Sequence, residues 1–232
     1  MRRFFFALSV LMLTAGSLSA QLRQRTYTTG DPGVWFTAGV GGFTGTGVND
    51  GASSSSWDFG NSTNWQYRAS LEKGMSGGSS FGVSTSWARV PFVYSSNTAI
   101  PLPGDITGAR CATPCNGHLD LMTLLATFHA GGGQGFHQVV ELNGGIVAYD
   151  NLKRDSDGVK LAPAVGSIDP YFSIGYGFGY GFSDRTQIDF VPDYAIAIHE
   201  RSGLPNDVSN TNRMRSLRLT LRMGFGGGTR RR

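Results

Sequence analysis

Long apolar stretches are almost absent from this sequence. After residue 20 no run approaches the roughly 20 apolar residues that a spanning helix needs, which excludes a bundle of membrane helices. Charged residues are also few, at 16% of the chain against a usual share of about 25%. Disorder of the whole chain is excluded as well, because 40% of the residues are apolar and 12% are aromatic, which is enough to bury a core.

Glycine, in contrast, is abundant. It accounts for 34 of the 232 residues, about twice the ordinary share of roughly 7%. The composition therefore favours an all-β protein of strands separated by Gly-rich turns. The length is sufficient for one domain preceded by an export signal.

The first twenty residues have the pattern of such a signal. Arg2 and Arg3 precede the apolar core Phe4 to Leu13, and small residues follow up to Ala20. We expect cleavage near Ala20, so that residues 1–20 form a signal peptide. Removing the two arginines lowers the formal net charge from +4 to +2, and we expect no nucleic-acid partner for a mature chain so close to neutral.

Only two cysteines are present, in the stretch Cys111-Ala-Thr-Pro-Cys115. In the oxidising compartment that an exported chain enters, a pair this close usually forms a local disulfide. His118 follows three residues later, but the three side chains lack the fourth ligand of a structural metal site. We predict a disulfide, with a metal site as the alternative, and we expect no cofactor.

Period-two alternation of apolar and polar residues predicts eight strands. Each has about 10 to 16 residues, longer than the usual strand of a soluble protein and long enough to cross a membrane at a tilt. The strands are predicted at 33–44, 64–74, 79–94, 118–130, 135–149, 167–182, 185–199 and 213–225. The connections 75–78, 131–134 and 183–184 are short, whereas 45–63, 95–117, 150–166 and 200–212 are long and polar. This order is typical of an outer-membrane barrel with both termini on the periplasmic side.

The alternation also separates a lipid face from a lumen face. In the last strand Leu217, Leu219 and Leu221 alternate with Arg218 and Arg222. An eight-stranded barrel has an interior just wide enough for side chains, so charges inside must pair. We expect an ion-paired plug, with re-pairing around a conduction path as the alternative. The candidates for this network are Arg68, Glu72, Glu141, Asp189, Asp193, Arg218 and Arg222.

A soluble lipocalin-like barrel would alternate in the same way, but its exterior would be richer in Lys, which is scarce here. In the strand 118–130 the facing stays open, because Leu119, Leu121 and Leu125 compete with Met122, Leu124 and Phe128 for the lipid side. Aromatic residues near strand ends are expected to form girdles at the two membrane interfaces. These residues are Trp35, Tyr94, Phe136, Tyr149, Tyr180, Phe182 and Phe225.

With its export signal, eight strands and terminal strand Arg-Leu-Thr-Leu-Arg-Met-Gly-Phe, the sequence resembles the small outer-membrane β-barrel superfamily of OmpA, OmpX and OmpW type. The resemblance covers residues 21–225 and implies an eight-stranded antiparallel up-and-down transmembrane barrel. It also implies a monomer in the cell outer membrane, contacts with lipids and lipopolysaccharide, and recognition by the barrel-assembly machinery. Members often end on an aromatic residue, whereas here a basic Gly/Arg tail, 226–232, follows Phe225.

Three functions remain open at this point. The leading hypothesis is a non-enzymatic structural or surface-interaction protein that displays the disulfide-tied loop and the Ser-rich loop Ser53–Ser56, with Trp57 and Phe59 folded back on the rim. The second is a porin-like or OmpW-like channel for small or hydrophobic solutes. The third, a lipid A-modifying enzyme, requires His199 within about 3 Å of a partner such as Glu200 or Ser202. We expect no catalytic residues.

Overall fold

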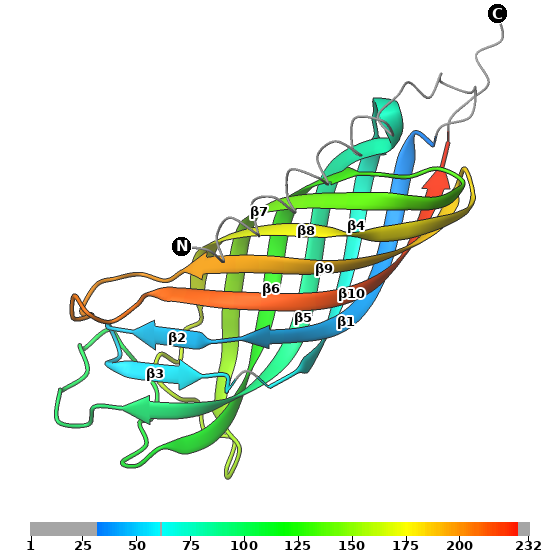
Figure 1. Cartoon of the computed structure of the whole chain (residues 1–232). Helices are drawn as coiled ribbons and strands as arrows, with labels where there is room; N and C mark the ends of the chain where they lie inside the picture. The colour runs from blue at the N-terminus through cyan, green and yellow to red at the C-terminus, as the bar shows by residue number, and fades with distance from the viewer. Residues whose placement is uncertain (1–31, 61, 227–232) are drawn as a thin grey trace, which may run out of the picture.

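Eight long antiparallel strands close into a barrel (Figure 1). The computed structural model describes residues 32–60 and 62–226, so the predicted signal peptide and most of the basic tail lie outside the described residues. Closure is complete because β1 pairs with both β4 and β10, while β5 pairs with β6. The elements are β1 (Val34–Gly45), β2 (Gly47–Asp50), β3 (Ser55–Asp58), β4 (Asn64–Gly74), a 3-10 turn (Ser76–Gly78), β5 (Ser79–Ser96), β6 (Cys115–Ala130), β7 (Gly135–Arg154), β8 (Ser167–Ser183), β9 (Thr186–Ile198) and β10 (Thr211–Phe225).

The connections define two ends of the barrel. The turn end carries the short links 75–78, 131–134 and 184–185, and the loop end carries the links 97–114, 155–166 and 199–210. No helix in the described part of the chain is long and apolar enough to cross a membrane.

The eight predicted strands are confirmed to within about five residues at each end, and the loop end contains two short strands that were not predicted. The predicted loop 45–63 contains the short strands β2 and β3, which lack the length to show a period-two pattern. β3 pairs with the last residues of β5, so it continues the wall where β4 is absent. Trp57 and Phe59 are buried there, as expected of residues folded back on the rim.

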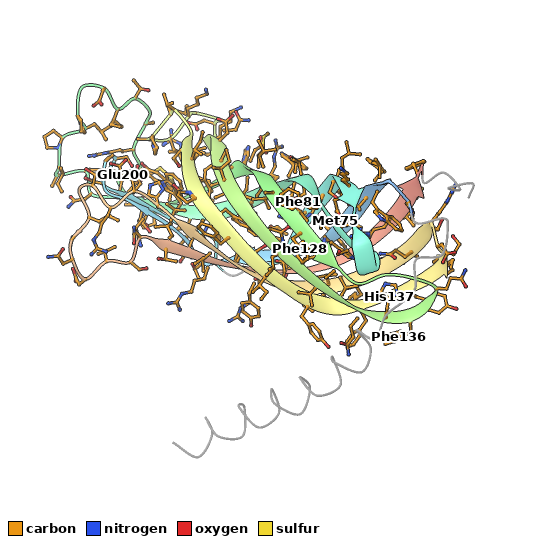
Figure 2. The ribbon with its side chains drawn as sticks, turned by 90° about the horizontal axis from the view of Figure 1, so that it is seen from above. Met75, Phe81, Phe128, Phe136, His137 and Glu200 are labelled. Atoms are coloured by element: carbon orange, nitrogen blue, oxygen red, sulfur yellow. A yellow bond between two sulfur atoms is a disulfide. The ribbon has the colours of Figure 1, made fainter. Side chains whose placement is uncertain are left out.

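The outer wall is apolar around the middle of the barrel. Along β8 the outward residues from Ile168 to Phe182 are exposed, while the residues between them are buried or small. In β6 the open facing is settled: Met122 and Leu124 lie outside, and Leu119 is fully buried inside. Figure 2 shows Phe136 and Glu200 at opposite ends of the barrel. An apolar exterior is the reverse of what a lipocalin-like soluble barrel presents to water.

The interior is divided into two halves of different chemistry. The half near the turn end is polar and charged, as predicted for the whole lumen, but the half near the loop end holds a hydrophobic core. Members of this core include Val90, Leu119, Leu121, Val147, Tyr149 and Met214. The prediction of a polar lumen was therefore too broad, because it did not assign the buried leucines of β6 to the inside.

Three of the seven residues predicted for the aromatic girdles point inward instead. Tyr94 and Tyr149 are fully buried in the loop-end core, where the Tyr94 hydroxyl donates to the Ala162 carbonyl at 2.9 Å. The Trp35 ring lies in the lumen 5.1 Å from the guanidinium carbon of Arg222. Position near a strand end was a poor guide, because the period-two alternation decides the face of the sheet.

Candidate functional site

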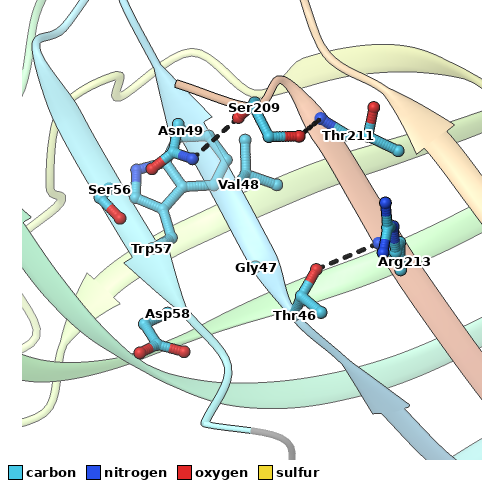
Figure 3. A pocket seen from close by; sticks show the side chains of 10 residues that line it. All are labelled: Thr46, Gly47, Val48, Asn49, Ser56, Trp57, Asp58, Ser209, Thr211 and Arg213. Carbon is cyan, nitrogen blue, oxygen red and sulfur yellow. Dashed lines mark hydrogen bonds between the residues drawn. The ribbon is translucent and has the colours of Figure 1, made fainter. Parts of the chain in front are cut away.

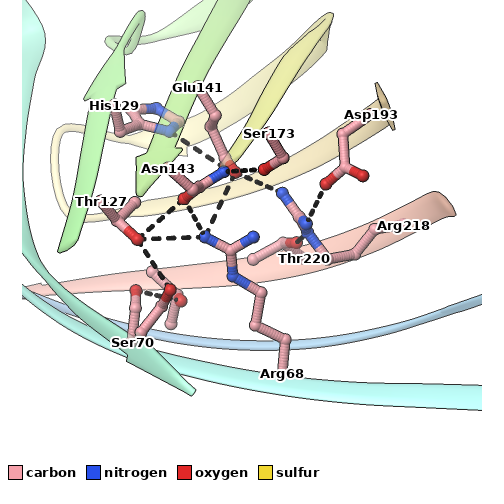
Figure 4. A network of polar contacts seen from close by, with 12 residues as sticks. Arg68, Ser70, Thr127, His129, Glu141, Asn143, Ser173, Asp193, Arg218 and Thr220 are labelled. Carbon is pink, nitrogen blue, oxygen red and sulfur yellow. Dashed lines mark hydrogen bonds and ion pairs between the residues drawn. The ribbon is translucent and has the colours of Figure 1, made fainter. Parts of the chain in front are cut away.

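A network of charges fills the lumen in its turn-end half (Figure 4). At its centre is Arg218 on β10, whose Nη1 lies 3.0 Å from Asp193 Oδ2 and whose Nη2 contacts Glu141. Arg68 on β4 approaches the same Glu141 carboxylate at 3.6 Å and donates to Asn143 Oδ1 at 2.7 Å. The buried Glu141 carboxylate therefore joins β7 to β4 and β10 across the lumen, and Asp193 adds β9 through Arg218.

A second group of ion pairs lies closer to the turn end. Arg222 Nη2 is 3.1 Å from Glu72 Oε2, and Arg222 Nε is 3.9 Å from Asp189 Oδ2. Glu72 also accepts hydrogen bonds from the hydroxyls of Ser70 and Ser80. Glu72, Asp189 and Arg222 are all buried, so these pairs are shielded from water.

All seven predicted lumen residues lie in these two groups, and two histidines join them. His129 Nδ1 lies 3.4 Å from Glu141 Oε1, and His137 Nε2 lies 3.6 Å from Asp189 Oδ1. His129 stands directly opposite Glu141 in the pairing of β6 with β7. It was missed because the facing of the strand 118–130 was unresolved in the sequence.

The network counts three arginines against four carboxylates, with two histidines beside them. Within this network three buried side-chain atoms have no hydrogen-bond partner among the described residues: His137 Nε2, Asp189 Oδ1 and Arg222 Nε. In the part of the chain that the structure covers, no group of three or more His, Cys, Asp or Glu side chains is arranged to hold a metal ion. Chemically this arrangement is a cross-linked plug of ion pairs.

A separate polar cluster closes the lumen at the loop end. His199 Nδ1 lies 2.9 Å from Asp169 Oδ1, and Nε2 lies 3.6 Å from Asp50 Oδ1. The Trp57 ring packs edge-on against the imidazole, with 5.9 Å between the ring centroids. Burial acts to lower the pKa of His199, but hydrogen bonds to the two aspartates outweigh it and raise the pKa to about 9. The imidazole is therefore a buried cation between two carboxylates.

The geometry of this cluster bears on the enzyme hypothesis. His199 faces the lumen side as the alternation predicts, whereas Glu200 and Ser202 are exposed. The hydroxyl of Ser53 donates to Asp50 and not to His199. Nucleophilic catalysis needs a hydroxyl hydrogen-bonded to a base, whereas the His199 imidazole is hydrogen-bonded to the Asp169 carboxylate.

The disulfide between Cys111 and Cys115 is confirmed. It ties the link 97–114 to the first residue of β6, and Ser96 Oγ donates to the Cys111 carbonyl at 2.9 Å. His118 contacts Asp155 at 2.7 Å, so it is paired elsewhere. The disulfide therefore closes a short loop directly before β6.

Among known proteins, this chain is similar to several β-barrels of known structure. No protein-family model matches the sequence, and no curated protein matches it significantly. Neisserial surface protein A is 12% identical with a TM-score of 0.45, over 83% of this chain and 97% of that chain. Ail from Yersinia pestis, solved with the heparin analogue sucrose octasulfate, is 12% identical with a TM-score of 0.40, over 82% and 99%. OprG from Pseudomonas aeruginosa is 11% identical with a TM-score of 0.41, over 85% and 97%.

The barrel fold follows from the way the strands pair. Each long strand is antiparallel to both of its neighbours, and consecutive long strands are adjacent around the ring. The chain therefore has a closed, eight-stranded, antiparallel up-and-down barrel fold.

Proposed function

We propose that the chain is a non-enzymatic outer-membrane protein whose barrel anchors the loop-end surface without conducting solutes. The observation that carries this proposal is the filled interior: ion pairs occupy one half of the lumen and a hydrophobic core occupies the other. An eight-stranded barrel has no spare width for a water column once its side chains are in place. In this proposal the partners are outer-membrane lipids, lipopolysaccharide and the barrel-assembly machinery, and the protein is a monomer.

Conductance across planar bilayers tests the filled lumen. We expect the refolded wild type to be silent, because a path would have to cross both halves of the interior. The double variant Arg218→Ala, Arg222→Ala removes two of the three lumen arginines but leaves the loop-end hydrophobic core in place, so we expect it to be silent as well. Steady channels from the wild type would contradict the proposal and favour a small porin. A heat-dependent gel shift before each recording establishes that the double variant has refolded.

A charged substitution on the outer wall tests whether the apolar outer face of β10 lies in a membrane. Leu219 lies outward on β10 with 51% of its surface exposed. Replacing it with Arg is expected to lower the free energy of unfolding in lipid vesicles by about 2–4 kcal/mol, because the charge would lie near the middle of the bilayer. Val165 is 73% exposed in the link 155–166, so Val165→Arg is the control and should change little. Equal effects of the two substitutions would argue against a membrane around β10.

A further inference from the structure

The outer wall has a hollow between β2 and β10 (Figure 3). Its volume is about 490 Å³. Hydroxyl and amide side chains and one guanidinium line it, from Thr46, Asn49, Ser56, Ser209, Thr211 and Arg213. Val48, Trp57 and Asp58 complete the lining, which is about equally polar and apolar. The hollow therefore offers hydrogen-bond donors and acceptors beside apolar surface, a combination that suits a sugar ring better than a hydrocarbon chain.

The hollow exists because the wall divides at Gly47. β1 stays paired with β10 as far as Gly45, and then β2 turns away to pair with β3. Gly47 has a φ of 113°, and a Cβ at this position would lie 2.1 Å from the Trp57 carbonyl oxygen. Only glycine fits this turn. The separation of the two strands is therefore built into the backbone.

Two arginines on the outward face of β10 lie at the hollow: Arg213 lines it, and Arg215 is the next outward residue toward the turn end. Arg213 and Arg215 are exposed, and neither guanidinium forms an ion pair with any residue that the structure describes. Arg215 lies over the ring of Tyr194, with 5.0 Å between its guanidinium carbon and the ring centroid. In contrast, Arg89, also outward near the loop end, is paired with Asp120 at 3.0 Å. The charges on β10 are thus available to an anion.

The surroundings of these arginines place that anion at the surface of a bilayer. Directly below them on β10 the outward residues are Leu217 and Leu219, both about half exposed. The neighbouring outward residue on β9 opposite Arg213 is Ile196. A molecule bound at the arginines would therefore have apolar wall beneath it and the hollow above it.

We propose that this surface binds the phosphorylated sugar headgroup of a glycolipid. The phosphate would contact Arg213 and Arg215, whose planar guanidinium groups match phosphate oxygens. The sugar would occupy the hollow, where the free carboxylate oxygen of Asp58 can accept from a sugar hydroxyl while Oδ1 accepts from the Gly60 amide at 2.8 Å. The acyl chains would lie along the apolar outer face of β9 and β10. The inference rests on the proposed function, because it needs the barrel in a membrane.

Binding by the refolded mature chain, measured by native mass spectrometry in detergent, tests the site. The probes are diphosphoryl lipid A, the same lipid without its phosphates, and phosphatidylglycerol. We expect diphosphoryl lipid A to bind best, and the double variant Arg213→Glu, Arg215→Glu to weaken it about tenfold or more, because charge-assisted hydrogen bonds are lost. Arg185→Glu makes the same kind of charge change at the turn end and should leave binding unchanged.

A second variant distinguishes the contribution of the sugar to binding from that of the phosphate. Ser56→Trp fills the hollow without altering charge, and we expect it to weaken lipid A binding while phosphatidylglycerol is unaffected. Undiminished binding by the arginine variant, or equal binding of phosphatidylglycerol and lipid A to the wild type, would overturn the inference. Insertion into vesicles is measured alongside. Wild-type protein that does not insert overturns the proposed function, whereas insertion without a glycolipid preference overturns this inference alone.

Discussion

Replacing Arg218 with Ala is expected to lower the free energy of unfolding by about 3–5 kcal/mol. The guanidinium is buried and contacts Glu141 on β7 and Asp193 on β9. Its removal leaves two buried carboxylates with fewer cations, and an uncompensated charge in a medium of low polarity is far more costly than the pair itself. The measurement is urea unfolding in lipid vesicles, followed by tryptophan fluorescence.

Two controls make the Arg218 result specific. Arg185→Ala removes an exposed arginine at the turn end and should change stability by less than about 0.5 kcal/mol. The double variant Arg218→Met, Asp193→Asn removes the cation together with one of its anions and leaves Glu141 paired with Arg68, and we expect it to be more stable than Arg218→Ala alone. A single Arg218→Ala variant as stable as the wild type would mean that the lumen charges are solvated rather than buried.

Raising the pH through about 9 is expected to lower the free energy of local unfolding at the loop end by about 3 kcal/mol. The pKa of His199 is near 9 in the folded protein and about 6.5 when unfolded, so the folded state binds the proton more tightly. The resulting stability is fully present below pH 6.5 and is lost as the pH rises through 9. The order of magnitude follows from the difference between the two pKa values. Hydrogen exchange of the amides in β2 and β3 between pH 7 and pH 10, corrected for the intrinsic rate, measures the change.

The variant His199→Gln supplies the matched comparison. It retains hydrogen-bonding capacity but has no proton to lose, so protection of β2 and β3 should be weaker than in the wild type at pH 7 and should not fall further by pH 10. A wild type whose protection stays constant across this range would show that the two aspartates do not depend on the imidazolium charge.

The sequence was a good guide wherever alternation was strict. In β10 every second residue from Leu217 to Phe225 points outward, so the positions of Arg218 and Arg222 followed directly. It was a poor guide in β6, where apolar residues occupy both faces and the period-two signal vanishes. There the inward leucines belong to a core above the ion pairs, and His129 could not be assigned to the network.

The loop-end cluster could not be predicted for a different reason. Asp50, Asp169 and His199 are far apart in sequence, and β2 is too short to show a pattern. Their meeting depends on the path of the chain after Gly47. Alternation indicated only that His199 faces inward, and the identity of its partners required the three-dimensional structure.

The hydrophobic core at the loop end has a consequence for recognition. Trp57, Tyr94 and Leu161 pack there, although they come from three separate segments of the chain. The surface above them is consequently ordered before any partner arrives, so association loses little conformational entropy in the protein. Its epitopes are conformational: antibodies raised against the folded barrel should not recognise peptides copied from 47–58 or 97–114, since neither peptide can assemble that core alone.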